Sequence, residues 1–115
     1  MNSCLFCKIV NKEIPSRNLF ENEDVLAFHD VNPQAPLHIL IIPKAHRESL
    51  FDFERKGDGR IQSLLLETAV RIARDQGLEK EGFRLVANTG RHGGQTVSHF
   101  HFHLLAGRPM NWPPG

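Results

Sequence analysis

Apolar side chains in the first part of the chain follow two different periods. Around residues 4 to 12 they recur at helical spacing before Pro15, which predicts a short helix with an inward apolar face. Short strands are expected at 18–20 and 25–29, with turn-forming polar residues between them. The uninterrupted apolar run 38–42 is typical of a central, buried strand. This part of the chain therefore predicts a short helix and the beginning of a β-meander.

The rest of the chain contains one long amphipathic pattern and a glycine-rich turn. Side chains suited to a buried helix face recur every three or four residues at Ile61, Leu64, Leu65, Thr68, Ala69 and Ile72. Asp58 is a possible cap at the start of this helix, and Gly77 is expected to close it. Strands are expected at 83–87 and 97–105, joined by a turn whose glycines permit unusual backbone dihedrals.

These elements predict an α+β fold in which an antiparallel sheet of about five strands is covered by one long helix and one or two short ones. The length of 115 residues fits a single domain, 1–115. A domain this short buries a smaller share of its surface than a larger one, so leftover apolar surface favours a homodimer.

The charge balance narrows the classes of partner. Lys and Arg total 14 against 13 for Asp and Glu, so there is no basic field of the kind that binds a nucleic acid. No run is long and apolar enough for a membrane span, and the amino terminus does not resemble a signal peptide. We therefore expect a cytoplasmic chain with no membrane partner. There its two cysteines are kept reduced.

Three histidines alternate along the expected strand 97–105. Because side chains of a strand point to alternate faces, His99, His101 and His103 share one face, roughly 6.5 to 7 Å apart. Imidazole titrates near neutrality, so one ring can act as a neutral nucleophile while its neighbour holds a proton. The row predicts an enzyme that attacks phosphorus in nucleotides. The alternative is a row of surface histidines opposite the core residues Phe100, Phe102 and Leu104.

The run His-Phe-His-Phe-His-Leu-Leu at 99–105 matches the histidine-triad pattern, and the chain resembles the Hint branch of the histidine triad (HIT) superfamily nearly end to end. The other matching motifs are Phe28-His29-Asp30, Pro33-Gln34-Ala35-Pro36, Ile42-Pro43-Lys44, Gly93-Gly94-Gln95 and Trp112-Pro113-Pro114-Gly115. The resemblance implies a HIT-like fold and a homodimer whose sheets join. It also implies hydrolysis of purine nucleoside 5'-phosphoramidates, in which AMP or GMP is joined to an amine such as lysine.

The resemblance also implies catalytic roles. His101 would be the nucleophile that forms a covalent nucleotidyl-histidine, which water later releases. His103 would contact the phosphate and the leaving group, and His99 would support the row. His38 matches the family's fourth active-site histidine, which is hydrogen-bonded to the triad. No catalytic metal is implied.

Nucleotide-binding roles follow from the same resemblance. Asp30 would bind the ribose hydroxyls, although an Asx turn is the common alternative for a carboxylate at this place. Amides of the glycine-rich turn can point at an anion. By resemblance the phosphate would also meet Asn88, Gly94, Gln95 and the hydroxyl of Thr96, where the family usually has serine. The expected nucleobase residues, each of which core packing would also explain, are Phe6, Ile9, Phe28 and Val31. The tail residue Trp112 would reach the partner's active site and affect substrate choice.

Cys4 and Cys7 have the spacing of half a zinc site, which needs two further ligands. Some histidine-triad proteins complete a structural Cys2His2 site with residues at the positions of His46 and His99. Many Hint proteins lack both cysteines, so two small, partly buried helix residues are the alternative. If zinc binds, His99 is a ligand rather than a proton carrier.

Three functions remain in competition. The first is a purine nucleoside phosphoramidase. The second is a dinucleoside polyphosphate hydrolase of the same superfamily, against which the Trp-Pro-Pro-Gly ending argues. The third is a non-catalytic nucleotide-binding or adaptor protein with a structural zinc. One departure from the family stands out: Ser98 takes the place of an aromatic residue often found before the triad.

Overall fold

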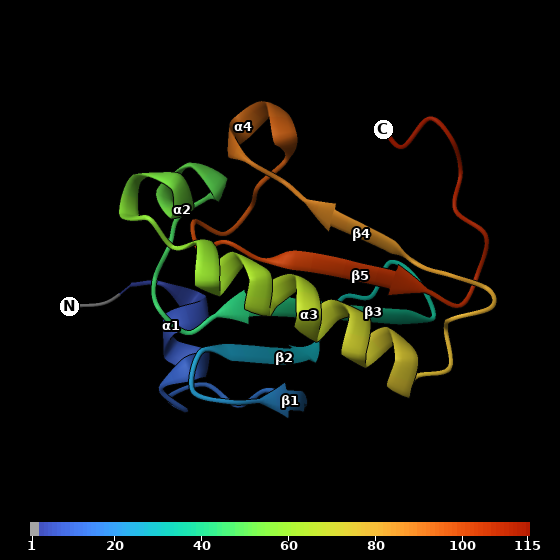
Figure 1. Ribbon diagram of the computed structural model, residues 1–115, viewed down its shortest axis with the longest axis horizontal. Helices are drawn as coiled ribbons and strands as arrows, with labels where there is room; N and C mark the ends of the chain where they lie inside the picture. The colour runs from blue at the N-terminus through green and yellow to red at the C-terminus, as the bar shows by residue number, and fades with distance from the viewer. Residues whose placement is uncertain (1–2) are drawn as a thin grey trace.

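Five antiparallel strands form one sheet in the order β1-β2-β3-β5-β4 (Figure 1). The structure is a computed structural model that describes residues 3–115. Its elements are α1 (Leu5–Val10), β1 (Asn18–Glu21), β2 (Val25–His29), β3 (Leu37–Pro43), α2 (Leu50–Lys56), α3 (Gly59–Asp75), β4 (Arg84–Ala87), α4 (Gly90–Gly93) and β5 (Phe102–Ala106). The predicted α+β class and antiparallel sheet are confirmed. Three short helices accompany the long one, because α2 and α4 formed in segments where no helix was expected.

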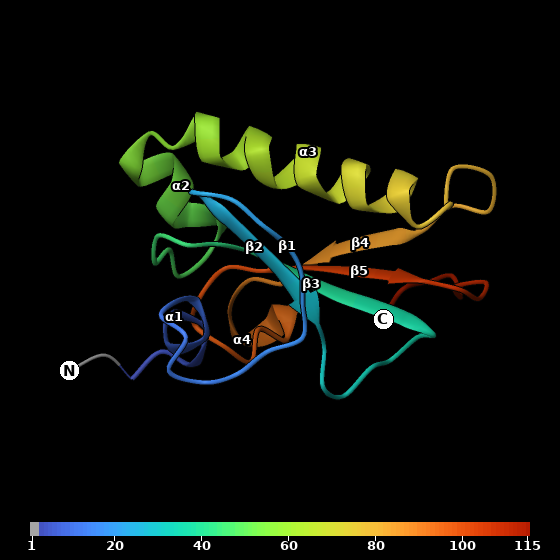
Figure 2. The same cartoon turned by 90° about the horizontal axis from the view of Figure 1, so that it is seen from below.

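Both faces of the central strands are covered (Figure 2). The helices α2 and α3 lie on one side of the sheet, and α1 and α4 lie on the other. The first side takes Val25, Ala27, Ile39 and Ile41 into its core. The opposite core takes Leu26, Phe28, Leu40 and Ile42, together with Phe6 and Ile9 of α1. Two covered faces explain why β2 and β3 are apolar at nearly every position rather than at alternate ones, His29 and His38 being the exceptions.

The long helix α3 buries the predicted stripe against the sheet, and the buried side chains are Ile61, Leu65, Thr68, Ala69, Ile72 and Ala73. The helix ends at Asp75, and Gly77 beyond it has a left-handed φ of +75°. Asp58 is the N-cap residue, but its side chain makes no capping bond. Its carboxylate accepts a hydrogen bond from Arg47 instead. Within residues 3–115, none of the helices has the length and apolar character needed to cross a bilayer.

The strand that carries the triad starts later than expected. β5 begins at Phe102 rather than at residue 97, so only His103 of the three histidines lies within it. Its ladder with β3 stops at the pair Ile41 and Phe102. Further along β3, Pro43 has no amide to donate, and its carbonyl accepts a bond from the ring of His99. The prediction of a regular strand over 97–105 is therefore wrong for its first five residues.

Candidate functional site

The three histidine rings still share one side of the chain although the ladder is broken. His101 packs edge-on against Phe6 of α1, with ring centroids 5.1 Å apart, and against His103 at 4.8 Å. Phe100 points into the opposite core. The predicted alternation of faces therefore holds in an extended segment that makes no regular ladder. His99 is completely buried and His101 is 5% exposed, so the row is not a surface stripe.

The hydrogen bonds of His101 leave one ring nitrogen with a lone pair. Its Nδ1 lies 2.8 Å from the carbonyl oxygen of His99. A carbonyl only accepts, so Nδ1 carries the proton and donates it. Burial lowers the pKa of His101 below its ordinary value, which keeps the ring neutral at pH 7. The neutral ring then has an unprotonated Nε2, which is the atom a nucleophilic histidine needs.

His103 carries its proton on Nε2, the reverse of His101, because two successive hydrogen bonds fix the proton positions of His38 and His103. The amide of Gln34 donates to Nδ1 of His38 over 3.0 Å, so a neutral His38 carries its proton on Nε2. That Nε2 lies 2.9 Å from Nδ1 of His103 and donates to it. A neutral His103 therefore carries its own proton on Nε2. Burial, with the nearby rings of His101 and His38, lowers the pKa of His103 to about 4.

Asp30 connects this chain of donors to the loop after β2. Its Oδ2 lies 3.4 Å from Nε2 of His38. Burial lowers the pKa of His38, and the negative charge of Asp30 partly offsets that effect. The other oxygen, Oδ1, accepts from the amide of Asn32 at 2.8 Å. This is the Asx turn named as the alternative role, and it holds the carboxylate beside the histidines.

A cavity of about 210 Å³ opens beside the triad. His101, His103 and Asp30 line it together with Thr96. Of the expected nucleobase residues, Phe6, Phe28 and Val31 line this cavity. Ile9 is buried in the core on the α1 side. Further lining residues that had no predicted role are Leu5, Pro15, Ser16, His29, Leu40 and Val97. They come from α1 and the loop after it, from β2 and β3, and from the segment before β5, which meet only once the chain is folded.

Four potential metal ligands converge on the other side of His99. The nitrogen of His99 nearest the sulfurs, Nδ1, lies 3.3 Å from Sγ of Cys4 and 3.6 Å from Sγ of Cys7. His46 Nδ1 is 3.3 Å from Sγ of Cys7 and 3.2 Å from Nδ1 of His99. Tetrahedral zinc, with Zn–S of about 2.3 Å and Zn–N of about 2.0 Å, sets such ligand atoms about 3.3–3.8 Å apart. The spacing of the predicted Cys2His2 set therefore fits zinc.

The tautomer of His99 also fits a metal ligand. Its Nε2 donates to the carbonyl oxygen of Pro43 over 2.8 Å, which leaves a lone pair on Nδ1. A ligating histidine commonly donates its other nitrogen to such a carbonyl. Burial lowers the pKa of His99 to about 4, so the ring is neutral as ligation requires.

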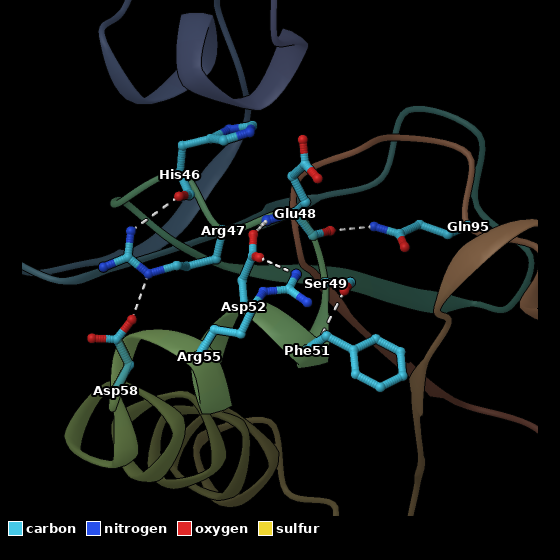
Figure 3. Close-up of polar contacts among 9 residues, drawn as sticks. All are labelled: His46, Arg47, Glu48, Ser49, Phe51, Asp52, Arg55, Asp58 and Gln95. Atoms are coloured by element: carbon cyan, nitrogen blue, oxygen red, sulfur yellow. Dashed lines mark hydrogen bonds and ion pairs between the residues drawn. The ribbon is translucent and has the colours of Figure 1, made fainter.

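Two amides of the glycine-rich turn and the side chain of Gln95 make hydrogen bonds within the chain. The amides of Gly94 and Gln95 donate to the carbonyls of Arg91 and Gly90 in the short helix α4. Gly94 has a left-handed φ of +78°. The side chain of Gln95 donates to the carbonyls of Glu48 (2.6 Å) and Val97 (3.0 Å), as Figure 3 shows for Glu48. In the described geometry these two amides are bonded within the turn and Gln95 is a clamp between two loops, so the expected anion cradle stays a prediction.

Three further predicted residues lie away from the cavity. Asn88, Gly94 and Trp112 are not among its lining residues. Trp112 is 82% exposed, in a tail that Arg84 holds by donating to the carbonyl of Asn111 at 2.8 Å. Their roles at the phosphate and at a partner's site stay predictions.

Comparison with known proteins agrees with this arrangement. The HIT domain family matches residues 11–110. The chain is 51% identical to the "14 kDa zinc-binding protein" of Zea mays over 96% of this chain and 87% of that protein. It is 50% identical to "Adenylylsulfatase HINT1" of Arabidopsis thaliana over 96% of this chain and 76% of that protein.

Solved structures of HIT proteins also resemble this chain. A "HIT family hydrolase from Legionella pneumophila Philadelphia 1" superimposes with a TM-score of 0.94 at 48% identity, covering 98% of this chain and all (100%) of that one. A "Histidine Triad Protein from Clostridium difficile" gives 0.90 at 45% identity, with 96% of each chain covered. The family model matches most of the chain, and similar proteins are found by sequence and by structure. This chain therefore belongs to the HIT domain family.

Proposed function

We propose that this chain is a nucleotide hydrolase that cleaves the phosphorus–nitrogen bond of purine nucleoside 5'-phosphoramidates, with His101 as nucleophile. The observation that carries the proposal is the pair of opposite tautomers. Nε2 of His101 offers a lone pair, whereas Nε2 of His103 carries a proton. Both residues line the same cavity as Asp30. A phosphoryl transfer needs such an attacking atom and a donor for the departing group.

In the first step, Nε2 of His101 attacks the α-phosphorus while the bond from phosphorus to the amine breaks. The free ring of His103 is neutral, with a pKa of about 4. A bound phosphate brings negative charge, which raises that pKa and lets the ring hold a second proton. The departing amine takes the proton from Nε2 of His103 and leaves as a neutral molecule, while the second proton stays on Nδ1.

In the second step, water replaces the histidine. The now neutral His103 accepts a proton from water as the new oxygen–phosphorus bond forms and the bond to His101 breaks. The nucleoside monophosphate leaves, His103 gives its second proton to solvent, and both rings return to their starting states. In the free chain His38 donates to Nδ1 of His103, which keeps Nε2 toward the reaction. When Nδ1 of His103 is itself protonated, the N–H of His38 turns to Oδ2 of Asp30, 3.4 Å away.

Phe6 and Phe28 make an edge-on pair, with ring centroids 5.7 Å apart, at the apolar part of this cavity. We assign them, with Val31, to the nucleobase and Asp30 to the ribose hydroxyls. Thr96 is assigned to the phosphate side, and Ile9 supports Phe6 from within the core.

We further propose that Cys4, Cys7, His46 and His99 hold a structural zinc ion. Bound zinc would supply a cross-link between α1, the loop after β3 and the triad, and no step of the reaction. The donor set and spacing described above support this proposal. Metal analysis of protein purified without added metal is expected to give about one zinc per chain. A metal-free protein with unchanged stability would contradict it.

A homodimer is proposed from the free edge of the sheet. In the described chain, β4 ends the strand order and has a neighbour on one side only. On the nearby helix α3, Leu66 is 50% and Val70 49% exposed. Sedimentation should give twice the chain mass, and Val70→Asp should shift it toward the monomer. A monomeric wild type would refute the dimer.

Trapping the covalent intermediate tests the proposed activity. Acid quenching during turnover of an adenosine 5'-phosphoramidate should give a nucleotidyl adduct that mass spectrometry locates on His101. Rates on this substrate, on diadenosine tetraphosphate and on adenylyl sulfate should rank the phosphoramidate first. A faster reaction with either of the others would reassign the substrate. Nucleotide binding without turnover of any of the three would favour the adaptor alternative.

A further inference from the structure

A second depression adjoins the cavity that holds the triad. It has a volume of about 490 Å³ and lies between the start of α1, the loop after β3 and the segment that enters the triad. Leu5, Thr96 and Val97 line both hollows. A group bound at the phosphate beside Thr96 therefore has a direct way into the second depression.

Glu48 gives this depression a negative charge. Its side chain is exposed, and it is the one carboxylate among the lining residues that the structure describes. Two bonds hold its backbone: its amide donates to Asp52, and its carbonyl accepts from Gln95, each over 2.6 Å. Figure 3 shows the two bonds that anchor the backbone of Glu48, whose side chain lines the hollow.

The charge of Glu48 is not neutralised by the arginines around it. Arg55 pairs with Asp52 at 2.6 Å, and Arg47 turns away to Asp58 (Figure 3). Among residues 3–115 no ion pair or side-chain hydrogen bond is made by the Glu48 carboxylate. The nearest acidic neighbours are paired while this one is available for a cation.

The remaining wall is mixed. Ser3, Thr96 and Ser98 bring hydroxyl groups, and Leu5 and Val97 bring apolar side chains. Cys4 and His46, two of the proposed zinc ligands, complete the lining. The hollow therefore combines room, hydroxyl groups that accept and donate hydrogen bonds, and one carboxylate.

We infer that this depression is the leaving-group subsite and that Glu48 selects amines that carry a further positive charge. The inference rests on the proposed phosphoramidase activity and deepens it by naming a substrate class. The substrate class is a nucleoside phosphoramidate of a diamine or another amine with a second, protonated nitrogen. The nitrogen bound to phosphorus departs past Thr96, and the distal ammonium group pairs with Glu48.

The test compares two adenosine phosphoramidates of equal length, one with an aminopropyl group and one with a butyl group on the nitrogen. Only the first has a distal ammonium. The measured quantity is the ratio of their kcat/KM values, so that any general loss of activity cancels. The variants are Glu48→Gln and Glu48→Lys. Glu54→Gln is the matched control, because Glu54 is an exposed glutamate of the same region outside the depression.

The wild type should prefer the cationic substrate about two- to fivefold, the range of one exposed ion pair. Glu48→Gln should bring the ratio near one, Glu48→Lys should reverse it, and Glu54→Gln should leave it unchanged. Added salt should reduce the ratio of kcat/KM values in the wild type, since exposed charges are screened. Zinc content is measured on each variant, because loss of zinc would show that the substitution has disturbed the nearby ligand His46 as well as the charge. Equal ratios in the wild type and Glu48→Lys would overturn the inference.

A binding measurement separates this inference from the proposed activity. Adenosine 5'-sulfamates with the same two substituents contain no phosphorus to attack. If the wild type turns over neither phosphoramidate but binds the cationic sulfamate more tightly in a Glu48-dependent way, the activity fails and the subsite stands. If turnover is normal but neither kcat/KM nor binding distinguishes the substituents, the subsite fails and the activity stands.

Discussion

Two clusters of metal-ligating side chain types lie on either side of His101. One contains Cys4, Cys7, His46 and His99, and the other contains Asp30, His38 and His103. In both, the ligand atoms lie within 4.8 Å of one another. Proximity alone would assign a metal to each cluster.

The directions of the hydrogen bonds distinguish the clusters. Around His38 the two short ring contacts each have one donor and one acceptor, from the Gln34 amide to His38 and from His38 to His103. At the cysteine side, Nδ1 of His99 presents a lone pair to two sulfurs and a second imidazole. Soft sulfur and imidazole donors suit zinc, whereas the first arrangement is already satisfied by protons. The comparison teaches that proton positions, more than distances, separate a metal centre from a proton network.

The largest expected effect comes from the residue between the clusters. His101→Ala should lower kcat/KM by about a thousandfold or more, because it removes the nucleophile. Zinc content should stay at the wild-type level, since His101 belongs to neither cluster. Steady-state kinetics and metal analysis on the same preparation check both claims. Retained turnover would remove His101 from the mechanism.

Cys7→Ser should break the metal cluster and spare the proton network. We expect loss of zinc and a drop of about 2–4 kcal/mol in the free energy of unfolding, because metal binding contributes to folding. Urea denaturation with and without added zinc measures the drop. Asp30→Asn is the control from the other cluster and should keep its zinc. A Cys7→Ser protein with full zinc content would contradict the assigned ligand set.

His38→Phe tests the proton network. It removes the donor to Nδ1 of His103 and leaves that nitrogen without a partner, so kcat should fall about ten- to a hundredfold, as for a buried acceptor left unsatisfied. His38→Gln retains an N–H donor and should recover part of the rate. Identical rates for the two variants would mean that the donor is unimportant.

The smallest expected effect is on stability in acid. The pKa of His103 is about 4 in the folded chain, below the ordinary value of 6.5. Between these values the unfolded chain binds more protons than the folded one, so stability falls as pH decreases from 6.5 to 4. His103→Gln should have a shallower decline. Urea denaturation across this range measures both slopes, and equal slopes would argue against the lowered pKa.

Much of the fold could be predicted from local patterns. The bounds of β2 at 25–29 followed from a short apolar run after turn-forming residues. The buried stripe of α3 followed from helical periodicity, because that helix buries one regular face. Helices α2 and α4 were missed since seven and four residues give too little repeat to recognise. The late start of β5 was not predictable, because it depends on Pro43 and on a ring far from it in sequence.

The site was predictable as a set of residues but not as a set of proton positions. The resemblance to histidine-triad proteins named His101, His103 and His38. Their tautomers depend on the Gln34 amide and the His99 carbonyl, whose directions are known only after folding. Glu48 was missed because an exposed glutamate outside any motif carries no signal until its neighbours are found paired with one another.

Because the centre of the sheet is covered on both faces, its amides should exchange hydrogen with solvent more slowly than those around the cavity. Amides of β3 between the two cores should exchange their hydrogens with solvent only when the whole chain unfolds. Thr96 and Val97, which line both hollows and lie outside the ladder, should exchange through small local openings. The ladder includes His103 and ends before His101, so the entrance for substrate can open and close many times without loosening the strands that hold His38 and His103.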